Sequence, residues 1–199
     1  MNAMEVNIHY FRLINDLGKQ YPMWNPVFYV IAEYMVYGLA LAVFLYWFRR
    51  TSENRMMVIC GTVTFFLAEL FGKVAGSLHY NQQPSAELTD VNQLVQKAVN
   101  NSFPSDHTIL FFSFCMSFWL FKKRSGIFWM LLALCMGISR IWVGVHYPAD
   151  VIVGALISIG SALAVYLVVP RLPIVHTLLG FYEKAEQALF PAKQKSRDL

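Results

Sequence analysis

The chain has 199 residues, of which 57% are hydrophobic and 14% are charged, and its mean hydropathy is positive at +0.45. Soluble domains carry about 25% charged residues, so this composition excludes an ordinary soluble domain and predicts one integral-membrane domain. The formal net charge of +4 is small. The basic residues gather at the ends of apolar segments instead of forming a stripe, which argues against nucleic acid as a partner.

The N-terminal segment is polar but carries apolar residues at helical spacing, namely Val6, Tyr10, Leu13, Ile14 and Leu17. This periodicity predicts an amphipathic helix over residues 4–19, lying on the membrane surface, and we assign residues 1–25 to it. The segment lacks a basic stretch followed by a short apolar core, so no cleavable signal peptide is expected.

Apolar segments long enough for a bilayer core of about 30 Å follow at residues 27–48, 56–78, 104–121, 127–145 and 149–169. The predicted fold is therefore all-α: a polytopic membrane helix bundle of about five transmembrane helices within residues 27–169, plus the N-terminal surface helix. The polar loop 80–103 is expected to hold a short helix at 91–99. Residues 170–199 are expected to form a cytoplasmic amphipathic segment, at 174–190, and a basic tail.

The cysteines Cys60, Cys115 and Cys135 lie inside apolar runs and have no CxxC spacing. This pattern argues against a disulfide framework and against a zinc site. We expect all three side chains to pack inside the protein.

Charged residues also occur inside the predicted spans. Glu33 is expected near the interface or paired inside the bundle. Glu69 and Lys73 are four residues apart with the acid first, the favourable order for a helical ion pair. Lys73 is equally compatible with a polar site, where it would offer a positive charge to an anion.

The basic loops indicate the orientation of the chain in the membrane. Short loops rich in Lys and Arg stay cytoplasmic, and with five spans the loops 49–55 and 122–124 and the C-terminal tail share one side. The surface helix, the loop 80–103 and the turn 146–150 then share the other side. We therefore expect the reactive groups at the outer face of the membrane.

Residues 139–150 join two spans and contain Arg140, His146 and Asp150. Such residues at the end of a membrane segment pair with one another or serve function. Pro148 favours a helix start, with Asp150 in the first turn and His146 just outside it. Asp150 could then hold one ring nitrogen of His146 and leave the other as a nucleophile or base, while Arg140 suits a phosphate or carboxylate.

Residues 101–107 form a second polar stretch, in which Pro104 predicts another helix start. Ser105, Asp106 and His107 would lie in its first turn, where backbone N–H groups favour an anion. Two histidines permit a division of labour in phosphoryl transfer. His146 would attack phosphorus and His107 would protonate the leaving oxygen.

The run Pro104 to His107, followed by Ser139-Arg140, His146 and Asp150, resembles the second and third signature motifs of the type 2 phosphatidic acid phosphatase superfamily. Within it, the chain most resembles the bacitracin-resistance type of undecaprenyl-pyrophosphate phosphatase. The resemblance implies a phosphohistidine at His146, supported by Asp150, and protonation by His107. It implies phosphate binding by the residues of the two motifs, Ser105, Asp106, Ser139 and Arg140, and it implies that neither a metal nor a cofactor is required.

This chain departs from the first signature motif of that family. The family has a lysine, six residues and then Arg-Pro, whereas this chain has Gln83-Pro84, with Gly76 at the lysine position. Gln83 could bind a phosphate oxygen without a charge. Lys73 lies one helical turn from the expected lysine and could still reach the phosphate.

These observations predict a membrane phosphatase that converts undecaprenyl pyrophosphate into undecaprenyl phosphate and inorganic phosphate. The resemblance implies that this reaction recycles the lipid carrier of cell-wall synthesis and confers bacitracin resistance. The expected partners are the polyprenyl pyrophosphate and membrane lipids, and no oligomeric state is predicted.

Three alternatives stay open. Within the same chemistry, the substrate could be phosphatidylglycerophosphate or phosphatidic acid, or another lipid could accept the phosphoryl group. A transporter or flippase would use intramembrane charges as a path, namely Glu33, Glu69, Lys73 and Arg140. A metal-dependent hydrolase would need ligands, for which the candidates are Asp106, His107, His146 and Asp150.

Overall fold

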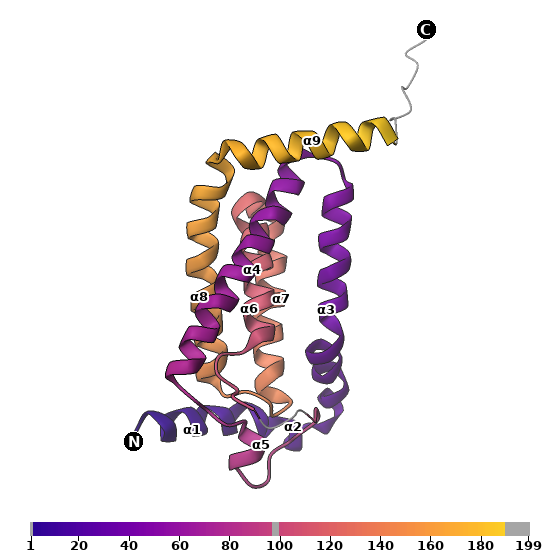
Figure 1. Cartoon of the computed structure of the whole chain (residues 1–199). Coiled ribbons are helices and arrows are strands. Elements are labelled where there is room, and N and C mark those ends of the chain that lie inside the picture. Colours follow the sequence, from indigo (N-terminus) through magenta and orange to yellow (C-terminus); the bar gives the residue numbers. More distant parts are fainter. Residues whose placement is uncertain (1, 97–99, 190–199) are drawn as a thin grey trace.

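The computed structural model describes residues 2–96 and 100–189, and this part of the chain is helical, without strands. The helices are α1 (Ala3–Asn15), α2 (Leu17–Gln20), α3 (Asn25–Phe48), α4 (Ser52–Leu78), α5 (Pro84–Glu87), α6 (Asp106–Phe121), α7 (Lys123–Trp142), α8 (Pro148–Val168) and α9 (Pro173–Leu189), with 3-10 turns at Pro22–Trp24 and Val169–Arg171. In Figure 1, α3, α4, α6, α7 and α8 stand as an upright bundle, and α1 and α9 lie across its two ends.

Helix α6 forms the centre of the bundle, in contact with α4, α7 and α8. Most of its 16 residues are apolar and most of them are buried, including Phe111, Phe112 and Phe118. A helix that is hydrophobic on all sides is typical of a protein interior. The core of the molecule therefore lies around α6.

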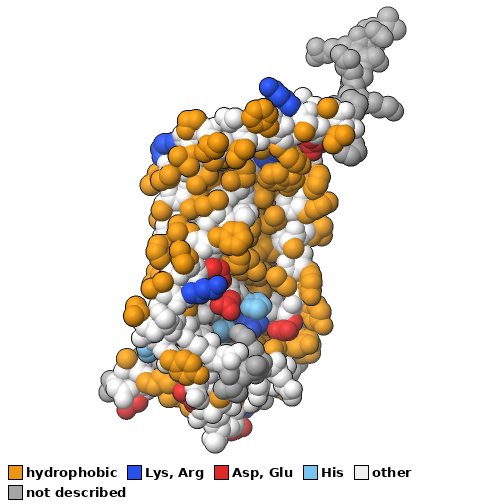
Figure 2. Space-filling view, in the orientation of Figure 1, with side chains coloured by type: hydrophobic (Ala, Val, Ile, Leu, Met, Phe, Trp, Pro, Cys, Tyr) orange, Lys and Arg blue, Asp and Glu red, His pale blue; other side chains and the backbone are white. Residues whose placement is uncertain are grey.

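Four segments are long and apolar enough to cross a membrane: Pro22–Phe48, Ser52–Leu78, Lys123–Trp142 and Pro148–Arg171, while Asp106–Phe121 is apolar but shorter. Large hydrophobic side chains are exposed on each long helix, for example Tyr37, Phe66, Phe128 and Leu156. Figure 2 shows the hydrophobic belt on one face of the bundle. The chain is thus a multi-pass membrane protein with the predicted helical fold.

Some helix starts differ from the prediction. Helix α4 begins four residues earlier than expected because Thr51 caps it, its hydroxyl accepting a hydrogen bond from Asn54 N at 3.3 Å. Helix α6 begins at Asp106 with Ser105 as the N-cap, so Pro104 precedes the helix. Pro148 is the first residue of α8, as predicted.

The helix expected at 91–99 is not present over residues 91–96, and residues 97–99 lie outside the described part. The reason is tertiary contact. Leu94 and Val95 pack against Trp142 and Val143, and Leu94 N donates to Val143 O at 3.2 Å. These long-range contacts take the place of local helical hydrogen bonds, and the loop instead forms the short helix α5.

Helix α1 was expected to lie on the membrane surface, but one of its faces packs against the helix bundle. Phe11 and Asn15 are fully buried. The Phe11 ring packs edge-to-face against Tyr147 with centroids 5.4 Å apart, and Asn15 Nδ2 donates to Trp142 O at 2.8 Å. The N-terminal helix therefore supports the connection between α7 and α8.

Helix α9 covers the opposite end of the bundle (Figure 1). The buried guanidinium of Arg55, on α4, forms ion pairs with Glu183, at 3.1 Å, and with Glu186. Trp47 Nε1 also donates to Tyr182 Oη at 2.9 Å. The loops after α3 and α6 reach this end, so these two basic loops share one side of the molecule, as expected, while the basic tail at 190–199 lies outside the described residues.

The cysteines follow the prediction in part. Cys60 and Cys115 are buried, but Cys135 is exposed on the outer face of α7. An apolar residue on a membrane helix can face lipid as well as protein, which hydropathy does not distinguish.

Candidate active site

The first turns of α6 and α8 lie against each other at the end of the bundle near α1. Ser105 N donates to Asp150 O at 3.1 Å. Gly154 permits this approach, because a Cβ there would lie 3.2 Å from Ser105 O. The two polar stretches, distant in sequence, therefore meet, with Asp106 and His107 in the first turn of α6.

His146 is buried just before α8, and its ring is oriented by a backbone carbonyl. Nδ1 lies 2.9 Å from Ser102 O and 3.6 Å from Asp150 Oδ2. A carbonyl oxygen only accepts hydrogen bonds, so Nδ1 carries the proton and Nε2 holds the lone pair of the neutral ring. We expected the His146 ring to hydrogen-bond directly to Asp150. The ring donates to the Ser102 carbonyl instead, and the Asp150 carboxylate lies near the same ring nitrogen.

Three donors converge on the buried carboxylate of Asp150. Ser102 Oγ and Tyr147 N each donate to Oδ2 at 2.9 Å, and Asn81 Nδ2 donates to Oδ1 at 3.1 Å. The bond from Tyr147 N is part of a capping box that begins α8. Such an arrangement suits an anion and holds its position relative to His146.

Tyr147 links the turn before α8 to the segment that contains α5. Its hydroxyl donates to Glu87 Oε2 at 2.9 Å. Burial raises the pKa of Tyr147, and the hydrogen bond to Glu87 raises this pKa further. The tyrosine therefore stays neutral and serves as a donor that fixes helix α5.

Arg140 is buried at the interface of α7 and α3. Its Nη1 donates to Ala32 O at 3.0 Å and to Glu33 Oε1 at 3.2 Å. The backbone N–H of His146 lies 3.3 Å from Arg140 O, which ties the two residues together. Glu33 is thus paired inside the bundle, one of the two placements expected for it.

Several buried polar atoms here have no hydrogen-bond partner within the described part of the chain, among them Ser105 Oγ and Arg140 Nε. Buried polar groups are nearly always hydrogen-bonded. Together with the N–H groups of the first turn of α6, they offer donors to a bound anion.

A pocket of about 300 Å³ opens beside these groups and is lined by Glu69, Gly72, Lys73, Gly76, Asn101, Phe103, Pro104, Asp106 and Ile109. Figure 2 shows a cluster of acidic, basic and histidine side chains that interrupts the hydrophobic belt. Glu69, Lys73 and Asp106 line the same pocket. The site is therefore polar, mixed in charge and open beside the apolar surface.

Comparison with known proteins identifies the family. The sequence pattern of the PAP2 superfamily matches residues 74–174. The chain belongs to the PAP2 superfamily. It is 54% identical over 198 residues to the bacitracin transport permease protein BcrC of Bacillus licheniformis, an alignment that covers 100% of this chain and 98% of that protein.

Two further relatives cover most of the chain. The undecaprenyl-diphosphatase BcrC of Bacillus subtilis is 26% identical, over 77% of this chain and 79% of its own length. The crystal structure of Aquifex aeolicus LpxE superposes with a TM-score of 0.63 and 26% identity, covering 81% of this chain and 94% of that chain. The fold is therefore that of a PAP2 protein.

The structure explains why the first PAP2 motif departs from its pattern. At Gly76, where the lysine would stand, an added Cβ would lie 2.8 Å from Phe103 O. Asn101 Nδ2 also donates to Gly76 O at 2.8 Å. A lysine does not fit this position, whereas Lys73, one turn earlier on α4, lines the pocket.

The ion pair expected between Glu69 and Lys73 does not form among the described side chains. Both residues line the pocket instead. The exposed lysine is thus placed to meet an anion, which was the alternative reading of its position.

Two further residues were predicted to bind phosphate, namely Gln83 and Ser139. Gln83 is buried immediately before α5. Ser139 is buried, and its hydroxyl donates to Met136 O at 2.7 Å, within its own helix. A PAP2 phosphate site at this position would use Ser105 and Arg140 directly, and Ser139 through the conformation of α7.

Sequence reasoning missed Ser102 and Asn81, which hold Asp150. Ser102 lies in the polar stretch 101–107, two residues before Pro104, and this proximity could have indicated a role in the site. Asn81 is one of several polar loop residues, and nothing in its spacing distinguishes it. Glu33 was noticed, but its partner Arg140 could not be assigned from sequence.

No group of three or more His, Cys, Asp or Glu side chains in residues 2–96 and 100–189 is arranged to hold a metal ion. The four ligands weighed for a metal-dependent hydrolase include Asp150, whose carboxylate accepts three hydrogen bonds from protein donors. Its position suits support of His146 better than metal coordination.

Proposed function

We propose that this PAP2 protein is a membrane phosphatase that hydrolyses undecaprenyl pyrophosphate to undecaprenyl phosphate and inorganic phosphate. The observation that carries the proposal is the orientation of the His146 ring. Its protonated Nδ1 donates to Ser102 O, and the Asp150 carboxylate lies close to the same nitrogen. The name of the B. subtilis relative, an undecaprenyl-diphosphatase, supports this choice of lipid.

The reaction runs in two steps. His146 Nε2 attacks the terminal phosphorus, the bond from phosphorus to the bridging oxygen breaks, and His107 protonates that oxygen as undecaprenyl phosphate leaves. Water then attacks the phosphohistidine while His107 takes its proton, which releases inorganic phosphate. Asp150 stabilises the positive charge that develops on the His146 ring.

The terminal phosphate is bound by donors from several elements. Arg140 and Ser105 supply the buried atoms Nε and Oγ. Asp106 contributes its backbone N–H at the start of α6, since its carboxylate would repel the phosphate. Lys73 adds a positive charge from the pocket wall. The buried residues Gln83 and Ser139 complete the proposed phosphate site with uncharged polar groups.

The position of the site suits a lipid substrate. The pocket lies beside the hydrophobic belt (Figure 2), so the prenyl chain can stay in the bilayer while the pyrophosphate enters. The basic loops lie at the other end of the bundle, which supports an active site that faces the outside of a bacterial cytoplasmic membrane. There the enzyme would recycle the lipid carrier of cell-wall synthesis and counter bacitracin.

Transport is a second candidate function, because the B. licheniformis relative carries the name of a bacitracin transport permease. A transporter would use the intramembrane charges as a path, among them the pair Arg140 and Glu33. It predicts bacitracin flux that depends on Glu33 and Glu69 and no release of phosphate.

The test is phosphate release from undecaprenyl pyrophosphate by the purified full-length chain in detergent with EDTA. We expect activity in wild type, none in His146→Ala, and a loss of about 10² to 10⁴ in His107→Ala. His176→Ala, at the far end of the bundle, is the matched control and should keep full activity.

Other outcomes identify the alternatives. Activity that EDTA abolishes supports the metal-dependent hydrolase. Release from phosphatidic acid or phosphatidylglycerophosphate alone changes the substrate, and phosphate found on an added lipid shows a transferase. If wild type releases phosphate from none of these lipids but carries bacitracin across a membrane, the phosphatase proposal fails.

A further inference from the structure

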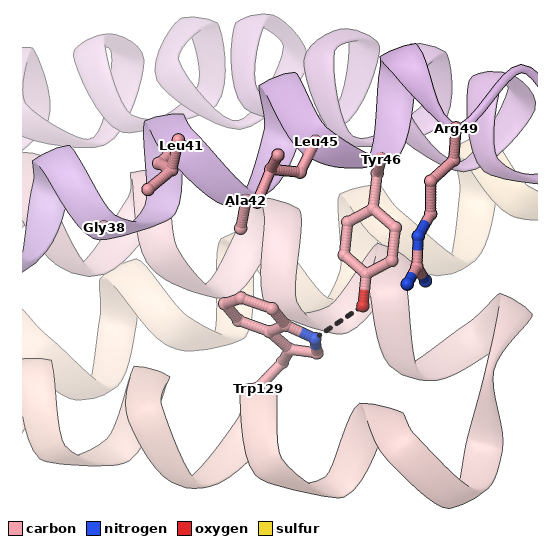
Figure 3. Close-up of a pocket in the computed structure, with 7 residues that line it drawn as sticks. All are labelled: Gly38, Leu41, Ala42, Leu45, Tyr46, Arg49 and Trp129. Atoms are coloured by element: carbon pink, nitrogen blue, oxygen red, sulfur yellow. Dashed lines mark hydrogen bonds between the residues drawn. The ribbon is translucent and has the colours of Figure 1, made fainter.

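A groove of about 410 Å³ runs between α3 and α7 at the end of the bundle away from the active site, and Figure 3 shows the residues that line it. They are Gly38, Leu41, Ala42, Leu45, Tyr46 and Arg49 on or just after α3, and Trp129 on α7. The groove has no role in the phosphatase chemistry, since Arg140 and Glu33 occupy the opposite end of the same two helices.

The wall of the groove suits a hydrocarbon chain. A Cβ added at Gly38 would meet no atom within 4 Å, so the surface of α3 is open there. Ala42 follows one turn later, and the exposed side chains of Leu41 and Leu45 flank the strip. Small residues on a membrane helix allow another chain to lie close to its backbone.

One end of the groove is polar. Trp129 Nε1 donates to Tyr46 Oη at 3.2 Å, so the hydrogen of the Tyr46 hydroxyl is directed to another acceptor. The Arg49 guanidinium extends to the same side as this hydroxyl (Figure 3). Two donors, one of them charged, therefore stand together where the apolar strip ends.

Arg49 differs from three basic residues at this end of the bundle that form ion pairs. Arg50 pairs with Glu186, Arg55 with Glu183, and Lys122 with Glu53. Within residues 2–96 and 100–189, no carboxylate lies within ion-pair distance of the Arg49 guanidinium. Its positive charge is thus uncompensated by protein at the mouth of an apolar groove.

We propose that this groove binds one anionic phospholipid, with an acyl chain along Gly38 and Ala42 and the headgroup phosphate on Arg49 and Tyr46. The charge of Arg49 selects the anionic headgroup, and a planar guanidinium suits a phosphate. The polar end lies away from the active site, so the ligand belongs to the leaflet opposite the one from which the pyrophosphate enters. The site is therefore separate from the substrate site.

The experiment is native mass spectrometry of the full-length protein, extracted from vesicles of equal parts phosphatidylglycerol and phosphatidylcholine. Wild type should retain one phosphatidylglycerol. Arg49→Gln should lower the ratio of retained phosphatidylglycerol to phosphatidylcholine by about tenfold, the order expected for one charge-assisted hydrogen bond. Gly38→Phe, at a position where an added Cβ meets no atom within 4 Å, fills the groove and should abolish retention.

Matched controls separate this site from general effects. Arg124→Gln removes an exposed arginine from the same end of the bundle, and Gly160→Phe adds the same bulk on α8, where a Cβ also meets nothing within 4 Å. Both should retain the lipid as wild type does. The proposal is overturned if Gly38→Phe keeps the lipid, if Arg124→Gln loses as much as Arg49→Gln, or if the retained molecule is a polyprenyl phosphate.

Discussion

The His146 ring is held by a backbone carbonyl 2.9 Å from Nδ1, and the Asp150 carboxylate stands 3.6 Å away. Both contacts depend on Ser102, whose carbonyl accepts from the ring and whose hydroxyl donates to Asp150. One residue outside the recognised motifs therefore connects the proposed nucleophile with the carboxylate that supports it.

Replacing Ser102 by alanine tests this connection, because the variant keeps the carbonyl and removes only the hydroxyl. We expect kcat to fall about tenfold, in line with the loss of one hydrogen bond to a charged group, while KM is unchanged. Ser105→Ala, which removes a proposed phosphate donor, should instead raise KM. Steady-state phosphate release measures both constants, and an unchanged kcat in Ser102→Ala would contradict a positioning role.

Helix α3 contacts the site through Arg140, which donates to Ala32 O and forms an ion pair with Glu33. The Arg140 side chain is buried, whereas the Glu33 side chain is 35% exposed. Solvent screens the glutamate, so the pair stabilises the fold only modestly. The pair also has a consequence for binding, because Glu33 uses one donor of the guanidinium that is proposed to bind phosphate.

Glu33→Gln should therefore lower the free energy of unfolding by about 1 kcal/mol, because Arg140 keeps a hydrogen bond to Ala32 O but loses its countercharge. Added inorganic phosphate should restore the lost stability by supplying a new anion. Thermal unfolding with and without phosphate measures this effect. The control Glu53→Gln, at the other end of the bundle, should show no extra protection, and equal protection in both variants would refute the link.

Helix α9 is held across the end of the bundle by one buried cation. The Arg55 side chain is 2% exposed and pairs with Glu183 and Glu186, which are 28% and 10% exposed. Its guanidinium also lies 5.1 Å from the centre of the Tyr182 ring. These contacts all come from α9, so the position of this helix depends on Arg55.

Arg55→Ala should release α9 and cost about 3 kcal/mol of stability, because breaking a buried pair removes the cation of Glu183 and leaves Glu186 with Arg50. Limited proteolysis should then cut between Pro173 and Leu189 faster than in wild type, while phosphatase activity falls less than stability. Arg124→Ala, an exposed arginine, serves as the control. Unchanged proteolysis of α9 in Arg55→Ala would show that apolar contacts alone hold the helix.

Across the whole molecule, the two ends of the bundle differ in chemistry. One end carries α1, the loop before α6 and the proposed active site, and the other carries the basic loops and α9 (Figure 1). The apolar belt between them has the dimensions of a membrane crossing. The orientation proposed here places the first end outside the cell.

Cysteine labelling of intact cells tests that orientation. Asp90→Cys, at a side chain that is 87% exposed, should react with a membrane-impermeant maleimide, and Ser125→Cys, at the other end, should react only after lysis. The buried Cys60 and Cys115 should stay unlabelled. The reverse pattern would place the active site in the cytoplasm.

The helices were predicted closely, because a run of apolar residues in lipid must satisfy its backbone hydrogen bonds locally. The start of α8 at Pro148 and the grouping of the basic loops at one end followed from the same local rules. The loop 80–103 was the main failure, since Leu94 and Val95 pack on α7 and Leu94 N donates to Val143 O instead of to a helical partner.

By itself, the sequence determined the membrane fold, the order of the helices and the residues that resemble the PAP2 motifs, since apolar length and motif spacing are properties of short segments. Only the tertiary structure decided that Ser102 and Asn81 hold Asp150, across 48 and 69 residues, and that Arg140 pairs with Glu33. It also decided that a groove opens beside Arg49. Each of these depends on which helix faces which neighbour, and in lipid that is set by packing and hydrogen bonds between distant segments, which hydropathy does not encode.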